Sequence, residues 1–171
     1  MNFECEIFAG NDEGWESIKP LVLKKKINIY ADGSRNKIVE AIVEENEKEQ
    51  NLDLAFSRFL YIGNAAYLNG DEKCIRTIWK YLKMIIKQKK EENSWGSEEI
   101  ICFLFKYLPE RLLDSENLSL NNYIYKRGRI ILIMELLYQE ANTPGVDDKL
   151  GKKVFSLCSN LSKQAQHYAT H

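Results

Sequence analysis

Histidine, proline and cysteine are scarce in this chain of 171 residues, and the scarcity of histidine and cysteine excludes whole classes of site. The two histidines, His167 and His171, both lie within the last five residues, so no buried acid–base site that depends on imidazole is expected. The four cysteines are widely spaced and form no CxxC pair, which argues against zinc and against a disulfide framework. We therefore predict no metal and no cofactor.

Sequence motifs for the common catalytic sites are also missing. No GxSxG, Walker, GxGxxG, HExxH or calcium-loop pattern occurs anywhere in the chain. An enzyme would have to use carboxylates such as Glu98, Glu99 or Glu135 in a cleft, and this is the last of the function classes we consider. We expect a protein without enzymatic activity.

Long apolar runs are absent as well. The longest uninterrupted run, Ile100–Phe105, is far shorter than the ~20 residues of a membrane span. The first residues include Glu4 and Glu6, whereas a signal peptide carries positive charge there. The expected location is the cytoplasm, with no membrane partner.

What is present is the composition of one ordinary globular domain. Apolar residues make up 44% of the chain and charged residues 29%, and the formal net charge is −1. Such a balance argues against a protein that coats nucleic acid through its overall charge. We predict a single domain over residues 1–171, without a prediction of oligomeric state.

Apolar residues recur at spacings of three and four along most of the chain, which is the helical period. We expect an all-α fold of about seven helices packed as antiparallel hairpins, the first capped by Ser17 and the second by Ser34. The expected helices span about residues 17–32, 34–50, 53–69, 71–90, 97–108, 120–141 and 146–161. Alternation over Asn2–Phe8 also permits a short N-terminal strand or arm.

One hairpin carries a recognisable pattern. Gly63 and Gly70 are seven residues apart, and Gly70-Asp71 precedes apolar residues that include Trp79. Residues 53–90 therefore resemble one tetratricopeptide hairpin, which implies a surface for binding proteins. Ile75, Ala66 and Lys87 depart from the residues that this family prefers, and no second copy follows at its period. The alternative is a close helix crossing followed by an ordinary turn, and both interpretations predict an antiparallel helix pair.

Acidic residues gather on the helix expected over 34–50. Glu40, Glu44 and Glu47 follow a spacing of four and three, so they form one glutamate ridge along the helix. Together with neighbours near the end of the helix they make an acidic face of six residues: Glu40, Glu44, Glu45, Glu47, Glu49 and Asp53. Either a basic partner binds this face, or it is a solvated surface that Lys37 and Lys48 balance.

Basic residues gather on the helix expected over 71–90. Residues 73–90 hold seven basic residues and no acidic one. Six of them lie within about 100° of arc and form a basic stripe: Lys73, Arg76, Lys80, Lys83, Lys87 and Lys90. The stripe is a candidate phosphate-binding site, although its lysines do not favour the reading of bases.

A second basic group, Lys126-Arg127-Gly128-Arg129, follows Tyr123 and Tyr125. The aromatic residues beside it fit a nucleic-acid site, and they also fit a helix turn around buried tyrosines.

Small size, helical hairpins, no catalytic set and one acidic helix together resemble the helical immunity proteins with which bacteria neutralise toxins of contact-dependent inhibition systems. The resemblance implies a cytoplasmic protein whose acidic face blocks the basic cleft of a toxin domain, such as a nuclease. The first alternative is a tetratricopeptide-like adaptor or regulator that binds a peptide or protein. The second is a nucleic-acid-binding accessory protein that uses the basic stripe, although nucleic acid is not the partner we expect.

Overall fold

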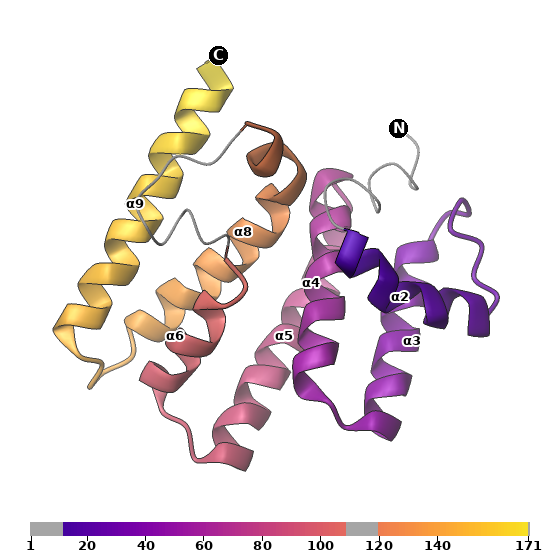
Figure 1. The fold of residues 1–171 in the computed structure, drawn as a ribbon, viewed down its shortest axis with the longest axis horizontal. Coiled ribbons are helices and arrows are strands. Elements are labelled where there is room, and N and C mark those ends of the chain that lie inside the picture. The colour runs from indigo at the N-terminus through magenta and orange to yellow at the C-terminus, as the bar shows by residue number, and fades with distance from the viewer. Residues whose placement is uncertain (1–11, 109–119, 171) are drawn as a thin grey trace. The chain divides into compact units, whose positions relative to one another are not determined.

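Helices form all the regular secondary structure in the residues that the computed structural model describes, 12–108 and 120–170. Seven helices fall within these ranges, and no strand does, so the predicted all-α class is confirmed (Figure 1). The strand considered for Asn2–Phe8 lies outside the described residues. The helices are α2 (Asp12–Lys24), α3 (Ser34–Glu49), α4 (Leu52–Leu68), α5 (Glu72–Asn93), α6 (Ser97–Phe105), α8 (Leu120–Ala141) and α9 (Asp148–Thr170).

Contacts between residues divide the chain into two units. Unit 1 consists of residues 1–87 and 125–129, and unit 2 consists of residues 88–124 and 130–171. Helices α5 and α8 each contribute residues to both units. The single domain expected over 1–171 stays a prediction, and the two units are described separately below.

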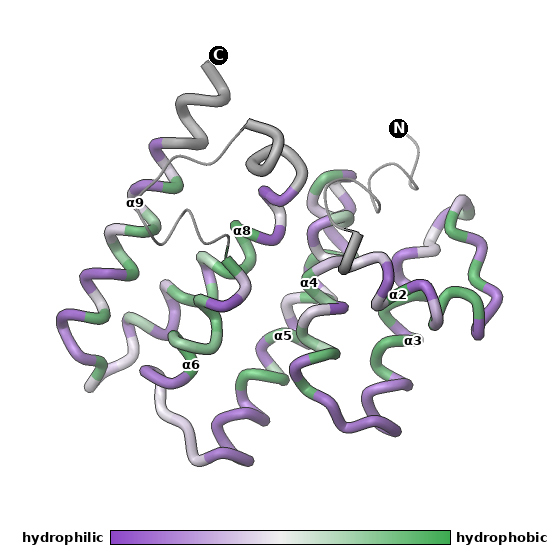
Figure 2. Tube along the Cα trace, in the orientation of Figure 1, coloured by the Kyte–Doolittle hydropathy of each residue, from purple (hydrophilic) through white to green (hydrophobic). Residues whose placement is uncertain are grey.

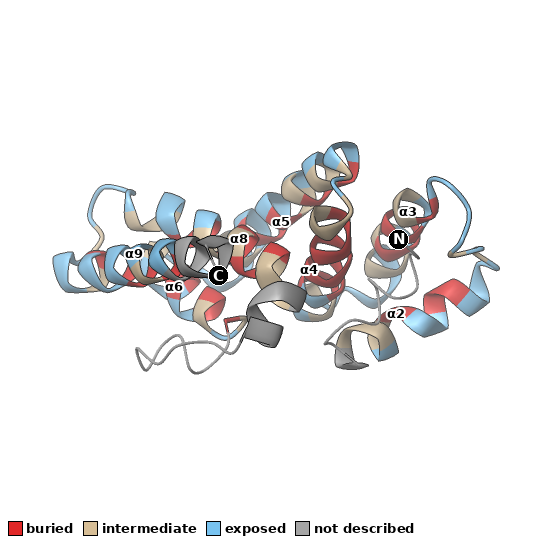
Figure 3. Ribbon diagram, turned by 90° about the horizontal axis from the view of Figure 1, so that it is seen from above, coloured by how far each residue is buried: buried red, intermediate tan, exposed pale blue. Residues whose placement is uncertain are grey.

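Helix α4 is the centre of unit 1. Nearly every residue from Ala55 to Ala66 is buried, on all sides of the helix, which Figure 3 shows as an almost continuous red ribbon. Its sequence is largely apolar, and Figure 2 shows it as green that purple and pale segments interrupt. Helices α2 and α3 pack against α4 and against each other. A helix that is apolar all round must be covered on all sides, and α4 is the element around which unit 1 forms.

Helix α3 has a single buried face. Ile38, Val39 and Ile42 are at most 2% exposed, and burial of such a side chain stabilises the fold by roughly 1.5–3 kcal/mol. Ser34 is not the N-cap, which corrects the sequence prediction. Gly33 takes that position with a φ of 77°, and the buried Ser34 hydroxyl instead donates to the Ile29 carbonyl at 3.2 Å.

Helix α2 differs most from its prediction. It begins at Asp12, so Pro20 lies inside the helix, and Ser17 is not a cap because its hydroxyl donates to the Gly14 carbonyl at 2.6 Å. The helix ends at Lys24, since Lys26 takes a left-handed φ of 53°. The Ile27 N–H then bonds to the Val22 carbonyl at 3.0 Å, which closes the last turn.

Helix α4 and the unit 1 part of α5 form the expected antiparallel hairpin. Gly70 reverses the chain with a φ of 67°, and the Asp71 carboxylate accepts the Cys74 N–H at 3.2 Å as the cap of α5. Along the pair, the rings of Phe59 and Tyr81 stack with centroids 5.2 Å apart. The turn chemistry deduced from the sequence is confirmed here.

Unit 2 contains α6, α9, the end of α5 and most of α8. Helix α6 begins after Gly96, whose N–H donates to the Glu99 carboxylate at 3.0 Å. Apolar residues of α9 such as Val154 are buried, as the predicted one-sided pattern requires. Lys90 and Glu140 form an ion pair of 3.0 Å that joins the end of α5 to α8.

Helix α8 approaches α4 closely within unit 1, at Gly128. A Cβ atom added to Gly128 would lie 2.7 Å from Tyr67 Cβ and 3.0 Å from Asn64 Cα. The buried Asn64 side chain accepts the backbone N–H of Arg129 at 3.0 Å. The approach requires glycine because Tyr67 Cβ and Asn64 Cα cannot move without the main chain of α4, and the nearby Asn64 Oδ1, at 2.9 Å, is held by its hydrogen bond.

We predict that Gly128→Ala destabilises the protein. Overpacking costs roughly 1–3 kcal/mol, which outweighs the ~1 kcal/mol by which alanine favours a helix over glycine. Chemical denaturation measures the change in the free energy of unfolding. Gly151→Ala in α9 is the matched control, because nothing lies within 4 Å of the added Cβ, and it should stabilise the protein. Equal effects of the two substitutions would contradict a close approach at Gly128.

Candidate binding faces

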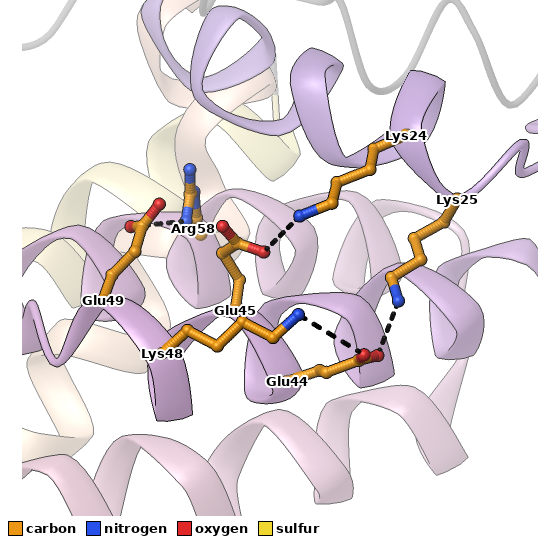
Figure 4. A network of polar contacts seen from close by, with 7 residues as sticks. All are labelled: Lys24, Lys25, Glu44, Glu45, Lys48, Glu49 and Arg58. Carbon is orange, nitrogen blue, oxygen red and sulfur yellow. Dashed lines mark hydrogen bonds and ion pairs between the residues drawn. The ribbon is translucent and has the colours of Figure 1, made fainter.

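The acidic face is partly neutralised by basic residues of the same unit, as Figure 4 shows. Lys25 Nζ lies 2.8 Å from Glu44 Oε2, and Lys24 Nζ lies 3.5 Å from Glu45 Oε2. Lys48, one turn along the same helix, approaches the other Glu44 oxygen at 4.0 Å. The two carboxylates are therefore compensated from the end of α2 and from α3 itself.

Glu49 has a different kind of partner. The side chain of Arg58, on α4, is only 9% exposed, and its Nη1 lies 3.7 Å from Glu49 Oε2. Arg58 Nε donates to the Ser17 carbonyl at 3.0 Å, less than one turn before Pro20 in α2. Since a nearly buried guanidinium requires a counter-charge, Glu49 serves the fold before any partner.

The ridge positions Glu40 and Glu47 remain uncompensated. Both side chains are exposed, and neither forms an ion pair within the part of the chain that the structure describes. Asp53, the last residue of the acidic face, is also exposed and lies in the first turn of α4. The structure thus divides the predicted face into paired residues and two open glutamates.

The pKa of Glu44 is below its ordinary value. The hydrogen bond from Lys25 is the main cause, and the charge of Lys25 adds to it. The interaction therefore favours the folded state above the ordinary carboxyl pKa, and this contribution disappears as the pH falls through the lower pKa of the folded state.

We predict that Lys25→Ala raises the pKa of Glu44 toward its ordinary value and changes the melting temperature little, because exposed ion pairs contribute little to stability. Titration of the Glu44 carboxyl carbon by NMR measures the shift. The control is Lys37→Ala, which removes an exposed lysine of α3 that forms no ion pair with described residues. An unchanged Glu44 titration in Lys25→Ala would show that the pair does not form in solution.

Five members of the basic stripe lie in unit 1, and all five are exposed. We call them the α5 basic face: Lys73, Arg76, Lys80, Lys83 and Lys87. None has a carboxylate partner among the described residues, and the only contacts that lysines of this face make with aromatic rings are Lys83 over Trp79 at 5.1 Å and Lys80 over Tyr81 at 5.9 Å. Unlike the acidic face, this face has no ion pairs with described residues that would offset its positive charge.

Lys90, the sixth member of the stripe, forms an ion pair with Glu140 in unit 2. The nearby Lys89 lies over the rings of Trp95 and Phe103, at 5.4 Å and 5.2 Å. These contacts place the end of α5 in the packing of unit 2, so it does not extend the α5 basic face.

The second basic group does not form an open surface. Gly128 is buried against α4, and the Arg127 Nε atom is buried without a hydrogen-bond partner in the part of the chain that the structure describes. The side chains of Tyr123 and Tyr125 lie outside that part. Gly128 and Arg129 form the contact of α8 with α4.

Unit 2 contains an open depression of about 410 Å³, lined by Trp95, Glu98, Glu99, Cys102, Phe103 and Lys106. Its carboxylates have local structural roles: Glu99 caps α6, and Glu98 accepts the Asp147 N–H at 3.2 Å. Glu135 is exposed on α8. The three carboxylates named as an enzymatic alternative are therefore not gathered in one depression.

Among the described residues, no group of histidine, cysteine and acidic side chains could hold a metal ion. The side chains of His167 and His171 lie outside the described range. Burial raises the pKa of the Cys74 thiol to about 12, so that thiol stays protonated at neutral pH. Cys102 is exposed and Cys158 is half-buried.

Sequence reasoning missed Lys24, Lys25 and Arg58 as the partners of the acidic face. The one signal in the sequence is Arg58 itself, the only charged residue between Leu54 and Leu68, which indicates a buried counter-ion.

Comparison with known proteins adds no relative: no protein-family model, curated protein or solved structure matches this chain. Among the described helices, none combines the length and the apolar content that a membrane span requires.

Proposed function

We propose that this protein is a non-enzymatic binding module that uses the glutamate ridge of α3 to engage a basic partner. One observation carries the proposal. Glu40 and Glu47 are exposed and form no ion pair with the described residues, on a helix whose opposite face is buried through Ile38 and Ile42. The buried side of α3 holds the helix in the core, so the exposed glutamates can contact a partner without loss of folding stability.

The partner class follows from the charge of the ridge and from the resemblance to helical immunity proteins. A toxin domain that acts on nucleic acid presents a basic cleft, and a row of carboxylates on a rigid helix can occupy such a cleft. The mechanism is then steric and electrostatic occlusion in the cytoplasm. Glu44 contributes to this contact if the partner's basic groups replace Lys25 and Lys48.

The α4–α5 hairpin favours a second candidate, a tetratricopeptide-like adaptor or regulator. The turn at Gly70-Asp71 lies where the tetratricopeptide pattern expects it, and the stacked Phe59 and Tyr81 rings join the two helices. A client of the adaptor would bind beside this hairpin and would not depend on the glutamate ridge. The two candidates therefore differ in which substitutions weaken binding.

We predict that Glu40→Lys/Glu47→Lys slows association with the native partner severalfold or more at low salt and leaves the melting temperature nearly unchanged. Exposed charges act mainly on the association rate, and neither glutamate is part of an intramolecular ion pair among the described residues. The partner is obtained by affinity capture from the native host, and stopped-flow fluorescence measures both rate constants.

The matched control is Glu91→Lys/Glu92→Lys, which changes the net charge equally at exposed positions near the end of α5. It should slow association far less. Equal slowing by both variants would show that only net charge matters, and unchanged association in the ridge variant would exclude the ridge and favour the hairpin.

A further inference from the structure

The α5 basic face differs from the acidic face in one physical respect: none of its five residues forms an ion pair with a carboxylate of the described residues, although Glu72 lies in the first turn of the same helix. Three carboxylates of the acidic face pair with lysines or arginine of unit 1, whereas all five residues of the α5 basic face are without a carboxylate among the described residues. The face extends from Lys73 to Lys87, which is about 21 Å along the helix axis. A row of uncompensated positive charge of this length attracts an anionic partner.

The composition of the face distinguishes among anionic partners. Protein interfaces are poor in lysine and depend on aromatic anchors, and helices that lie on membranes insert several large apolar residues. The large apolar residue exposed beside this face on α5 is Met84, 47% exposed. Protein–DNA interfaces, in contrast, are polar and strongly positive. From this composition we infer that the α5 basic face binds the phosphate backbone of a nucleic-acid duplex.

The aromatic residues of α5 favour a duplex over a single strand. Single-strand sites stack bases on exposed rings. The Tyr81 ring is already stacked on Phe59, with an angle of 5° between the ring planes. Trp79 is half-buried, and Lys83 lies 5.1 Å from its ring centroid. The face offers point charges and no open ring, which suits phosphates.

The same chemistry makes binding independent of sequence. Four of the five residues are lysines, which contact phosphates as flexible point charges, whereas bidentate arginine is the commonest reader of guanine. Each neutralised phosphate contributes about 0.9 to the slope of log affinity against log salt, so the slope is at most about −4.5. Affinity then falls on the order of 10² to 10³-fold between 50 and 200 mM salt.

The test measures fluorescence anisotropy of a labelled duplex of about 20 base pairs, which is longer than the face, with two unrelated sequences and the matching single strand. The wild-type chain should bind both duplexes equally and the single strand more weakly. Lys80→Gln/Lys83→Gln should reduce the salt slope by about two and lower the affinity at 50 mM salt by about tenfold per lysine. Both positions are exposed, so circular dichroism should show an unchanged fold.

The matched control is Lys149→Gln/Lys152→Gln, which removes two exposed lysines with the same spacing from α9. It should leave affinity and slope unchanged. Equal losses in both variants, absence of duplex binding at 50 mM salt, or tighter binding of the single strand would each overturn the inference. So would binding to anionic vesicles or to a second copy of the chain that requires Lys80 and Lys83 while the duplex does not bind.

Discussion

The burial of α4 on all sides is the constraint on which unit 1 depends. From Ala55 to Ala66 the helix has almost no exposed position, so the charged and amide side chains buried there need partners on neighbouring elements. Arg58 is satisfied by Glu49 and by the Ser17 carbonyl, and Asn64 by the Arg129 N–H. These polar contacts restrict where α2, α3 and α8 can lie against α4. At Gly128, the absence of a side chain lets the Arg129 N–H come within hydrogen-bond distance of Asn64.

The distribution of charge follows from this arrangement. The end of α2 lies against α3, so Lys24 and Lys25 reach Glu45 and Glu44 and compensate part of the acidic face. Helix α5 uses one side for the core, through residues such as Ile78 and Leu82, and no other described element supplies acids to its outer side. The result is one charged face that is partly balanced and another that forms no ion pair among the described residues, although both belong to a chain with a net charge of −1.

Sequence patterns predicted the helices well where a local signal sets each end. The α4–α5 turn is an example, because Gly70 supplies the left-handed φ and Asp71 supplies the cap within a few residues. The end of α2 was predicted too late in the sequence. The helix ends because Lys26 takes a left-handed φ, a conformation that lysine rarely adopts. The bonds that close this turn join main-chain atoms, such as the Ile27 N–H and the Val22 carbonyl, so no side-chain pattern marks it.

The sequence predicted which charged residues share one side of a helix, but not which of them are paired with opposite charges. The period of 3.6 residues places Glu40, Glu44 and Glu47 on one side of a helix whatever the fold. Whether a carboxylate is compensated depends on residues far away in the sequence, such as Lys25 for Glu44 and Arg58 for Glu49. The division into paired and open charges therefore required the structure.

The central claim is that unit 1 binds a partner through the outer side of α3 while its core stays unchanged. Hydrogen–deuterium exchange of the chain, alone and with its captured partner, tests this claim most directly. We expect added protection in peptides that cover residues 40–47, with exchange in α4 unchanged because its amides are already buried. Protection confined to the turn between α4 and α5, with none over residues 40–47, would contradict it.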